Sequence, residues 1–326
     1  MGINFEGPLL EAISIRASTG SEIIGNKVSG VVPVTYFFSG FSFTETEGIF
    51  VYPVRGDASK IVGKLRIADN DIVANGNADF AFGIQVDKVN ADVEISGNTV
   101  SFPQNNGFLD HTGIGVFRGH SSVSILSNDI SMASGSLDTF PIPIMVAGDL
   151  DARYVIAKNH VINMHPNGDG IEVRGGDFSE PTQGTLVFNN RVFMNSSADV
   201  QGSGVTLFGA VNNTLVVHNH IEGTSAFAFE VSEGANATSL SDSNIFVDND
   251  ISKLLASVAD VYFGTNSSNT LFAGQCQTVI DLGLGNRISC GKHNNRREIK
   301  DHLKSVRAQE FELLRKNILD QRSDLP

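Results

Sequence analysis

An asparagine followed two residues later by Val or Ile returns along the chain at nearly even intervals. The pattern is visible in ISGNTVSF (95–102), ILSNDISM (125–132) and IAKNHVIN (156–163). It occurs at nine positions: Asn26, Asn70, Asn98, Asn128, Asn159, Asn190, Asn219, Asn249 and Asn286. The successive gaps are 44, 28, 30, 31, 31, 29, 30 and 37 residues, so six consecutive gaps lie between 28 and 31. Self-similarity at such a period indicates a repeat architecture.

Each period also contains a short segment in which apolar residues alternate with others. Examples are FGIQV (82–86), TGIGV (112–116), DGIEV (169–173), SGVTL (203–207), FAFEV (227–231) and ADVYF (259–263). Such alternation predicts a strand with one buried face. A polar turn and a second strand follow before the Asn. Two or three strands in about 30 residues leave no room for the helices of a βαβ array, and propeller blades need about 40 residues or more.

The repeat therefore predicts a coil of parallel strands, in which each turn of chain forms one rung. Rungs of this kind stack about 4.8 Å apart and enclose a core of Ile, Val, Leu and Phe. We expect the repeated Asn to adopt the left-handed conformation at a sharp corner. Its side-chain amide is then expected to hydrogen-bond the Asn of the next rung, which forms a ladder.

The body of the chain, residues 9–290, resembles the right-handed parallel β-helix superfamily of pectate lyases, polygalacturonases and related periplasmic repeat proteins. The unit that carries the resemblance is DGIEV … LVFNNRV. The resemblance implies an all-β, right-handed parallel β-helix of about nine rungs. It also implies an association with polysaccharides and an extracellular or periplasmic location.

Two regions depart from the repeat. The 44-residue gap contains an aromatic insertion at 31–47, within the β-helix domain of residues 1–291. The insertion could line a binding face or cap an exposed rung, and we expect a cap. Residues 292–326 lack Gly and place Ile299, Leu303 and Val306 at helical spacing. We expect a C-terminal helix that covers the last rung or the flank, and an oligomerising coiled coil is the alternative.

Charge and cysteine content limit the partners. From Lys292 onward the chain has 9 Lys+Arg and 6 Asp+Glu, so the remainder carries 23−9 = 14 basic and 36−6 = 30 acidic residues, a net charge of −16. Such a body repels nucleic acid and anionic membranes, and no apolar run reaches membrane length. Nor does the N-terminus have the form of a signal peptide. Cys276 and Cys290 form either a disulfide across neighbouring strands of an exported protein or two small buried residues.

The strand pattern also predicts which side chains point outward. One outward column is Ser14, Phe50, Gln85, Gly115, Met145, Glu172, Thr206, Glu230 and Tyr262. A second column, two residues further along, is Arg16, Tyr52, Asp87, Phe117, Ala147, Arg174, Phe208 and Ser232. Aromatic and charged side chains together are typical of a sugar-binding cleft. We predict that Asp87, Phe117, Phe208, Tyr262 and the loop residue His165 contact a glycan.

The densest group of charges lies in HPNGDGIEVRGGD (165–177). Asp169, Glu172 and Arg174 should project from this rung, and Glu230 follows two rungs later. The backbones of Glu172 and Glu230 are then about 9–10 Å apart. Inverting glycosidases hold their carboxyl groups roughly 6.5–9.5 Å apart. These four residues are the candidate catalytic set, although a solvated charged stripe is the simpler alternative.

Three functions remain open from the sequence. The leading hypothesis is a carbohydrate-associated protein that binds a glycan on its exposed sheet without evident catalysis. The second is a lyase or glycoside hydrolase that acts on an acidic polysaccharide, and the third is a structural surface module. The motifs of the resembled enzymes are mostly missing, and Arg174 is the only evident basic partner for a lyase. No cofactor is expected, although Asp169 and Glu172 could contribute to a calcium site. His160 and His220 are separated by one rung, so we expect structural roles for them.

Overall fold

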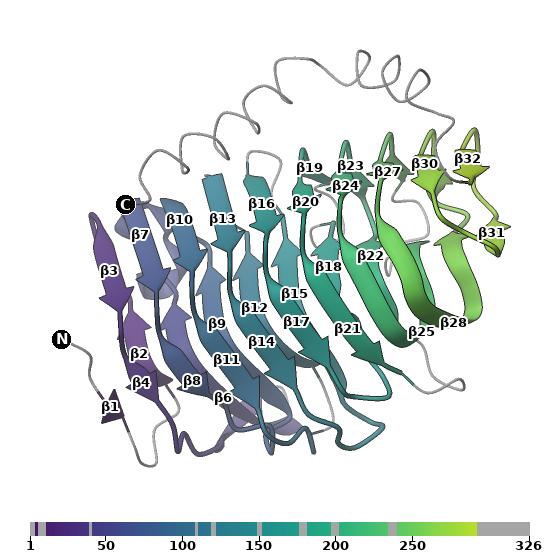
Figure 1. Cartoon of the computed structure of the whole chain (residues 1–326). Helices are drawn as coiled ribbons and strands as arrows, with labels where there is room; N and C mark the ends of the chain where they lie inside the picture. The colour runs from purple at the N-terminus through teal and green to yellow at the C-terminus, as the bar shows by residue number, and fades with distance from the viewer. Residues whose placement is uncertain are drawn as a thin grey trace, which may run out of the picture.

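The computed structural model describes residues 4–5, 11–38, 41–107, 110–118, 122–148, 152–175, 181–196, 202–233 and 240–291. These residues form an all-β parallel solenoid, in which successive turns of chain stack side by side along one axis (Figure 1). The fold class predicted from the repeat is confirmed. The expected C-terminal helix at 292–326 lies outside the described residues.

The wall of the solenoid has three faces. Face 1 contains β2 Glu11–Ile15, β6 Phe41–Val51, β9 Phe80–Asp87, β12 Asp110–Phe117, β15 Phe140–Ala147, β18 Ile171–Arg174, β22 Ser203–Phe208, the later parts of β25 His220–Ser232 and β28 Asp250–Phe263, and β31 Val279–Asp281. Face 2 contains β1 Asn4–Phe5, β4 Lys27–Val28, β8 Asp71–Val73, β11 Thr99–Phe102, β14 Asp129–Met132, β17 His160–Asn163, β21 Arg191–Asn195 and the first parts of β25 and β28.

Face 3 is a separate ten-stranded parallel sheet. Its strands are β3 Ser21–Ile24, β7 Val62–Ala68, β10 Asn90–Ser96, β13 Ser122–Leu126, β16 Arg153–Ala157, β20 Leu186–Phe188, β24 Leu215–Val217, β27 Ile245–Val247, β30 Leu271–Gly274 and β32 Arg287–Cys290. The remaining elements are short pairs and turns: β19 Thr182–Gln183 with β23 Val211–Asn212, β26 Ser241–Asp242 with β29 Ser267–Ser268, and the 3₁₀ helices η1 Val54–Gly56 and η2 Ala58–Lys60.

The core consists of equivalent apolar residues stacked turn upon turn. On face 1, Ile49, Ile84, Ile114 and Ile144 pair in register along the axis, and each is fully buried. Near the C-terminal end the stack becomes aromatic, with the ring centroids of Phe246 and Phe263 5.8 Å apart. The repeat thus builds one continuous core in which each turn packs on its neighbours.

The asparagine ladder exists and is buried. The side-chain amide of Asn98 donates to Oδ1 of Asn128 at 2.9 Å, and that of Asn128 donates to Oδ1 of Asn159 at 3.0 Å. Each Oδ1 also accepts the backbone N–H of the preceding ladder residue, for example Asn98 N to Asn128 Oδ1 at 2.9 Å. The same side-chain links join the whole series Asn26, Asn70, Asn98, Asn128, Asn159, Asn190, Asn219 and Asn249.

The conformation assigned to the ladder asparagines was wrong. The residue with positive φ is the one immediately before each of them, for example Ser127 (φ 53°), Lys158 (φ 58°) and Asp248 (φ 52°). The corner is therefore made by two adjacent residues. One turns the backbone, and the Asn side chain then bonds the next turn.

Asn286 does not belong to this ladder. Its Oδ1 accepts the backbone N–H of Thr270 at 2.9 Å, at the opposite end of the face 3 strands. Asn244 bonds Thr214 N in the same way at 2.9 Å, so a second, shorter column follows the other corner. The ladder contains eight of the nine predicted asparagines, and the expected number of nine rungs is not confirmed by it.

Several of the face 1 strands contain or follow a glycine at which the backbone bends. A Cβ on Gly83 would lie only 2.6 Å from the carbonyl oxygen of Gly113 on the next turn, and one on Gly48 would lie 2.5 Å from that of Gly83. The strand bends at this glycine. Gly83 and Gly113 do not pair, although the residues on both sides of them do. Side chains three residues apart, such as Phe82 and Gln85, consequently share the outer side, whereas in a regular strand they would lie on opposite sides.

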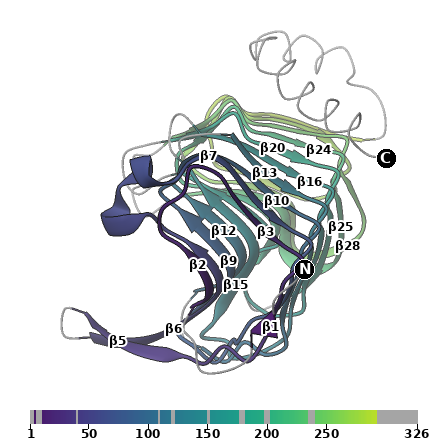
Figure 2. The same cartoon turned by 90° about the vertical axis from the view of Figure 1, so that its left-hand side faces the viewer.

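The insertion at 31–47 forms a hairpin and not a cap. Strand β5, Val34–Phe38, is antiparallel to the first part of β6, and within the described residues this is the only antiparallel pair. Figure 2 shows the hairpin extending sideways from the solenoid, so it does not cover the end. The expectation of a cap was wrong because strand pairing within the insertion satisfies its own backbone groups.

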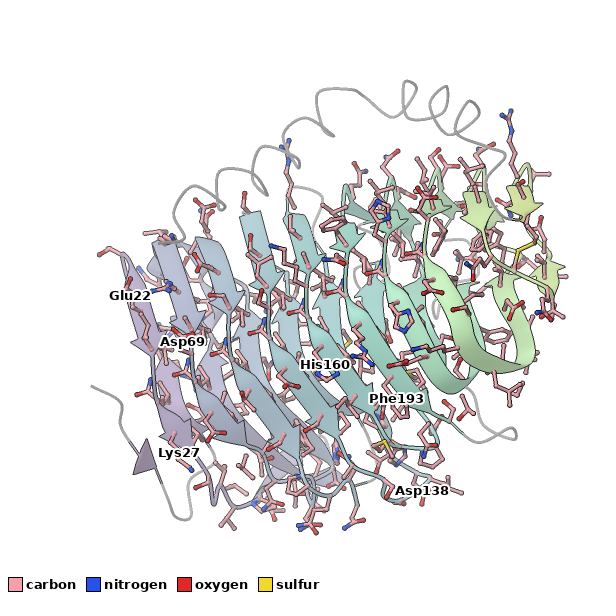
Figure 3. All side chains as sticks on the ribbon, viewed as in Figure 1. Glu22, Lys27, Asp69, Asp138, His160 and Phe193 are labelled. Carbon is pink, nitrogen blue, oxygen red and sulfur yellow. A yellow bond between two sulfur atoms is a disulfide. The ribbon has the colours of Figure 1, made fainter. Side chains whose placement is uncertain are left out.

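Cys276 and Cys290 form a disulfide, with their Cα atoms 5.1 Å apart. Cys290 pairs in register with Gly274, the last residue of β30, and Cys276 follows shortly after that strand. The bond therefore joins β32 to the segment directly after β30, at the C-terminal end of face 3 (Figure 3). Of the two alternatives that the sequence left open, the structure contains the disulfide. In the described part of the chain, no helix is long and apolar enough to cross a membrane.

Candidate functional site

Both predicted outward columns are aligned across the turns of face 1. Strand pairing places Gln85 beside Gly115, Gly115 beside Met145 and Met145 beside Glu172. The alignment continues from Glu172 to Thr206, Glu230 and Tyr262. The second column runs in register through Asp87, Phe117, Ala147, Arg174, Phe208 and Ser232. The predicted site residues on face 1 therefore share one surface.

A third outward column arises from the glycine bend. Asp169 precedes Gly170 and lies on the same side as Glu230, because Ser203 hydrogen-bonds both carboxyl groups. The charges of Glu172 and Glu230 act on the Asp169 carboxyl. Ser203 occupies the equivalent place on the next turn, immediately before Gly204, and its backbone N–H donates to Asp169 Oδ1 at 2.8 Å. Sequence reasoning missed Ser203, although the SG pair at 203–204 aligns with the DG pair at 169–170.

Asp169, Glu172 and Glu230 form a carboxyl cluster with Arg174 at its edge. The guanidinium of Arg174 donates to Glu172 Oε1 at 2.5 Å and lies 4.9 Å from the centroid of the Phe208 ring. The Ser203 hydroxyl donates to Glu230 Oε2 at 2.5 Å, so Ser203 links Glu230 to Asp169. Glu172 and Glu230 are separated by Thr206, and two strand spacings put their backbones about 9.6 Å apart.

The carboxyl groups in this cluster are buried, and burial sets their protonation. Glu172 is 2% exposed and Asp169 is 4% exposed. Burial raises the pKa of Asp169 well above its usual range, and the charges of Glu172 and Glu230 raise it further. Burial also raises the pKa of Glu172 and of Glu230, but Arg174 opposes the shift at Glu172, and hydrogen bonds from Ser203 and Ser232 oppose it at Glu230. The cluster thus combines Asp169, whose pKa is raised most, with Glu172, whose carboxyl accepts from an arginine.

Asp110 is a further member that the sequence did not indicate. Burial raises the pKa of Asp110, and its charge contributes to raising the pKa of both Glu172 and Arg174. Asp110 lies on β12, two turns from β18, so sequence spacing gives no signal for this proximity.

Aromatic rings and charged groups repeat along the rest of face 1. Phe50 and Tyr52 are stacked with centroids 5.7 Å apart, and the guanidinium of Arg16 lies 4.7 Å from the Phe50 centroid. The rings of Phe82 and Phe117 meet edge to face at 6.3 Å. At the C-terminal end the rings of Phe227 and Tyr262 lie 5.1 Å apart. All of these rings except Phe82 are half-buried, so part of each remains open to solvent.

Asp87 is bound by an arginine. Arg118 donates from Nε and from Nη2 to the two Asp87 oxygens, at 3.0 and 2.6 Å. Burial raises the pKa of Asp87, and this arginine opposes the shift. Asp87 is 4% exposed, so the half-exposed Arg118 presents the polar surface at this point.

His165 is placed differently from the other predicted contacts. It is fully buried in the turn before β18, where Nε2 lies 2.8 Å from Ser136 O and Nδ1 accepts from Asn167 N at 3.1 Å. Burial lowers the pKa of its ring. Because one ring nitrogen bonds its own turn and the other bonds Ser136 in the preceding turn of chain, His165 links two turns and does not face a ligand.

His160 and His220 lie on face 2, away from this cluster (Figure 3 labels His160). They are separated by Arg191 in the strand register, as the sequence spacing predicted. His220 lies between Asp250 at 3.0 Å and Glu222 at 3.2 Å. Among the residues that the structure describes, no group of three His, Cys, Asp or Glu side chains is arranged to hold a metal ion.

No protein-family model matches this chain, and no curated protein matches its sequence. The structure confirms the parallel solenoid. Membership of the superfamily of pectate lyases and polygalacturonases stays a prediction from the repeat.

Proposed function

We propose that the protein binds a polysaccharide across the outer side of face 1, with the chain of sugars running along the solenoid axis. The observation that carries the proposal is the row of half-buried rings, each beside a charged group, from Phe50 through Phe117 and Phe208 to Tyr262. Ligand sites combine apolar and aromatic walls with a few fixed polar groups. The strands of this face also curve in the view along the axis (Figure 2).

The charges favour a neutral polysaccharide over an acidic one. Arg16, Arg118 and Arg174 each already pair with a carboxylate on this face, at 2.5, 2.6 and 2.5 Å. Asp169, Asp110 and Glu230 add further acidic groups, and the whole body is acidic. A uronate would meet paired guanidinium groups within a negative field, which opposes its approach.

The disulfide supports an extracellular or periplasmic location for this activity. Disulfides such as Cys276–Cys290 persist in oxidising compartments and are rare in the cytosol. Polysaccharides accessible to a binding protein are also found outside the cell membrane in many organisms.

Binding is tested by a glycan panel on the purified full chain, followed by calorimetry on the best ligand. Phe208→Ala should weaken binding about tenfold, or about 1.4 kcal/mol. The matched control is Phe193→Ala, which removes a half-buried ring from face 2. Equal loss in both variants, or no binding to any glycan, would contradict the proposal and favour a structural module.

Hydrolysis of the bound glycan is a second candidate function, supported by the carboxyl cluster. In an inverting mechanism a protonated acid donates to the leaving oxygen while a carboxylate activates water, with the two carboxyls roughly 6.5–9.5 Å apart. Glu230 and Glu172 have backbones at about that separation, and their pKa values are raised. A lyase is less well supported, because Arg174 donates to Glu172 Oε1, and this contact stabilises the protonated guanidinium against acting as a proton acceptor.

The test for hydrolysis follows the release of reducing ends from the panel glycans, with unsaturated ends measured in parallel. Activity should disappear in Glu172→Gln, while glycan binding by this variant is retained. Binding without turnover in the unmodified protein would leave a recognition module. Unsaturated products would show that the protein cleaves the glycan by elimination and not by hydrolysis.

A further inference from the structure

Three buried oxygens on the outer side of face 1 have no hydrogen-bond partner among the described residues. They are Oε2 of Glu47, Oε1 of Gln85 and Oγ1 of Thr112. Glu47 is 2% exposed and Thr112 is fully buried, and the Gln85 oxygen is shielded from solvent although the residue as a whole is half-buried. A buried polar group without a partner destabilises the folded chain. Three such groups on one surface therefore indicate positions where a ligand supplies the partner.

Thr112 and Glu47 both point to the outer side of face 1. Each pairs in register with Phe82, one from the following turn and one from the preceding turn, and register partners in a parallel sheet point the same way. The Phe82 ring in turn meets the outward ring of Phe117. A Cβ on Gly115, in the outward column, would lie 2.7 Å from Cε2 of Phe117 and 3.2 Å from Cγ2 of Thr112. The Phe117 ring therefore lies against Gly115 and close to Thr112.

On each of three successive turns, one of these oxygens lies opposite an aromatic ring, and the two exchange sides from turn to turn. We call the outward residue directly before the glycine bend the leading position, and the outward residue three places later the trailing position. The leading and trailing residues are Glu47 and Phe50 on β6, Phe82 and Gln85 on β9, and Thr112 and Gly115 on β12, where the Phe117 ring covers the glycine. The oxygen is thus leading, then trailing, then leading. On the next turn, β15, both positions are apolar, Ile142 and Met145, so the alternation is a local feature.

We propose that β6, β9 and β12 bind three successive sugars of an extended, β-1,4-linked chain of neutral hexoses. In such a chain each sugar advances by close to one strand spacing and is turned over relative to the sugar before it. The edge that carries a given hydroxyl therefore changes sides at every sugar, as the unpartnered oxygens do at every turn. The rings then pack against the C–H groups of the opposite edge. An α-1,4-linked chain coils, so it cannot repeat these contacts on three successive turns.

The inference rests on the proposed glycan binding and adds the linkage of the glycan and the place where it is recognised. Burial raises the pKa of Glu47 to about 9, so its carboxyl is protonated at neutral pH, and Gln85 and Thr112 carry no charge. Carboxyl, amide and hydroxyl groups each pair with the hydroxyl groups of a neutral sugar. The carboxyl cluster begins on β18, two turns beyond β12, so recognition here does not depend on the acids considered for hydrolysis.

The free protein shields these oxygens, and a sugar reaches them only after neighbouring side chains move. Phe117 is half-buried, and rotation of its ring away from Gly115 uncovers the space beside Thr112. Rotations of single, partly exposed side chains are fast. Binding then exchanges an unsatisfied hydroxyl for one that is hydrogen-bonded, which favours the bound state.

Calorimetry on the full chain tests the linkage. The probes are trimers of β-1,4-linked glucose, mannose and N-acetylglucosamine, and the control is the α-1,4-linked glucose trimer. At least one β-linked trimer should bind about tenfold more tightly than the control, because the control leaves buried polar groups unpaired. Equal or tighter binding of the control would overturn the inference, as would binding of longer glycans without binding of any β-linked trimer. Absence of binding to every glycan would overturn the proposed function, and the inference with it.

Thr112→Val tests the site, because it removes one unpartnered hydroxyl and keeps the shape of the side chain. Affinity for the best β-linked trimer should fall about tenfold, whereas the melting temperature should not fall, since the folded protein loses no hydrogen bond. Thr214→Val removes another buried hydroxyl that lacks a partner in the described chain, directly before β24 on face 3, and is the matched control. It should leave the affinity within about twofold of the unmodified protein. Unchanged affinity in Thr112→Val, or a lower melting temperature together with weaker binding, would overturn the inference.

Discussion

At the scale of single residues, the corner between face 3 and face 2 depends on two adjacent positions with different tasks. The first adopts positive φ and is filled by residues as different as Asp69, Lys158 and His218. The second is the ladder Asn, which the sequence pattern identified correctly. The conformation was assigned to the wrong residue because the turning position varies among Gly, Asp, Asn, Ser, Lys and His, whereas the bonding position is always Asn.

The ladder predicts a large effect from a single amide. Asn128→Ala removes the donor to Asn159 Oδ1 and to Ile95 O, at 3.0 Å each, and the acceptor for the Asn98 backbone at 2.9 Å. These partners are buried and would be left unsatisfied, at about 1–3 kcal/mol for each group. We expect the free energy of unfolding to fall by about 3–5 kcal/mol in urea denaturation. Asn106→Ala, which loses an exposed contact to Asn77, should cost under about 0.5 kcal/mol.

Glu47 predicts an unusual pH dependence of stability. Burial raises its pKa from 4.5 to about 9, with further contributions from Glu45 and Glu11. The folded protein holds this proton more tightly than the unfolded chain, so the contribution to stability is complete below pH 4.5 and is lost as the pH rises toward 9.

Urea titrations from pH 5 to pH 9 check this contribution. The unmodified protein should lose stability across the range more steeply than Glu47→Gln, which cannot ionise. Glu22→Gln changes an exposed carboxyl and should follow the unmodified protein. Parallel curves for Glu47→Gln and the unmodified protein would show that Glu47 ionises normally.

At the scale of elements, the sequence predicted the alignment of neighbouring strands better than it predicted which corner of the solenoid a residue occupies. The outward columns were correct from Gln85 to Tyr262, because alternation within each strand and a fixed position for the inward Ile leave one register. Asn286 was assigned to the wrong corner because both corners place a hydrogen-bonding residue directly before a strand. The local pattern is the same at both, and only the path of the chain distinguishes them.

The disulfide at the C-terminal end predicts a local loss of stability. The Cys276–Cys290 bond closes a loop with a sequence separation of 14, and opening such a loop costs about 3 kcal/mol in the chain-entropy model. In the double variant Cys276→Ser, Cys290→Ser we expect faster amide exchange in residues 271–291. Exchange at Asn98 and Asn128 should be unchanged, because stacked turns contact only their neighbours. Equal acceleration at both places would mean that the solenoid unfolds as one cooperative unit.

Across the whole solenoid, the charge distribution indicates that a glycan is bound by contacts with rings and hydrogen-bonding groups and not by attraction between opposite charges. Face 1 carries arginines that are each paired with an acid, and the body has a net charge of −16 from the counts given above. Affinity for a neutral glycan should change less than about twofold between 50 and 500 mM salt, because counterion release contributes little. Tighter binding to a polyuronate at low salt than to any neutral glycan would contradict this assignment.

The sequence predicted the location of the carboxyl cluster but not its environment. Asp169, Glu172, Arg174 and Glu230 were expected on one surface, and the structure brings them together. The burial of Glu172 and Asp169 was not predicted, because it depends on packing between segments far apart in the chain. Asp110 was missed for the same reason, whereas Ser203 could have been found by aligning the residues before Gly170 and Gly204.

The glycine bends on face 1 have a consequence for how this chain tolerates change. Gly48 and Gly83 lie against a carbonyl oxygen of the following turn, and Gly113 lies in the same position one turn later, so any side chain there collides with the backbone. A saturation scan should therefore show intolerant sites at Gly48, Gly83 and Gly113, one in each of three successive turns, whereas the chain itself carries Pro143 and Ala228 at the equivalent place in later turns. Related solenoids could then lengthen or shorten only by whole turns, and they would keep the spacing of these glycines even after their other residues had diverged.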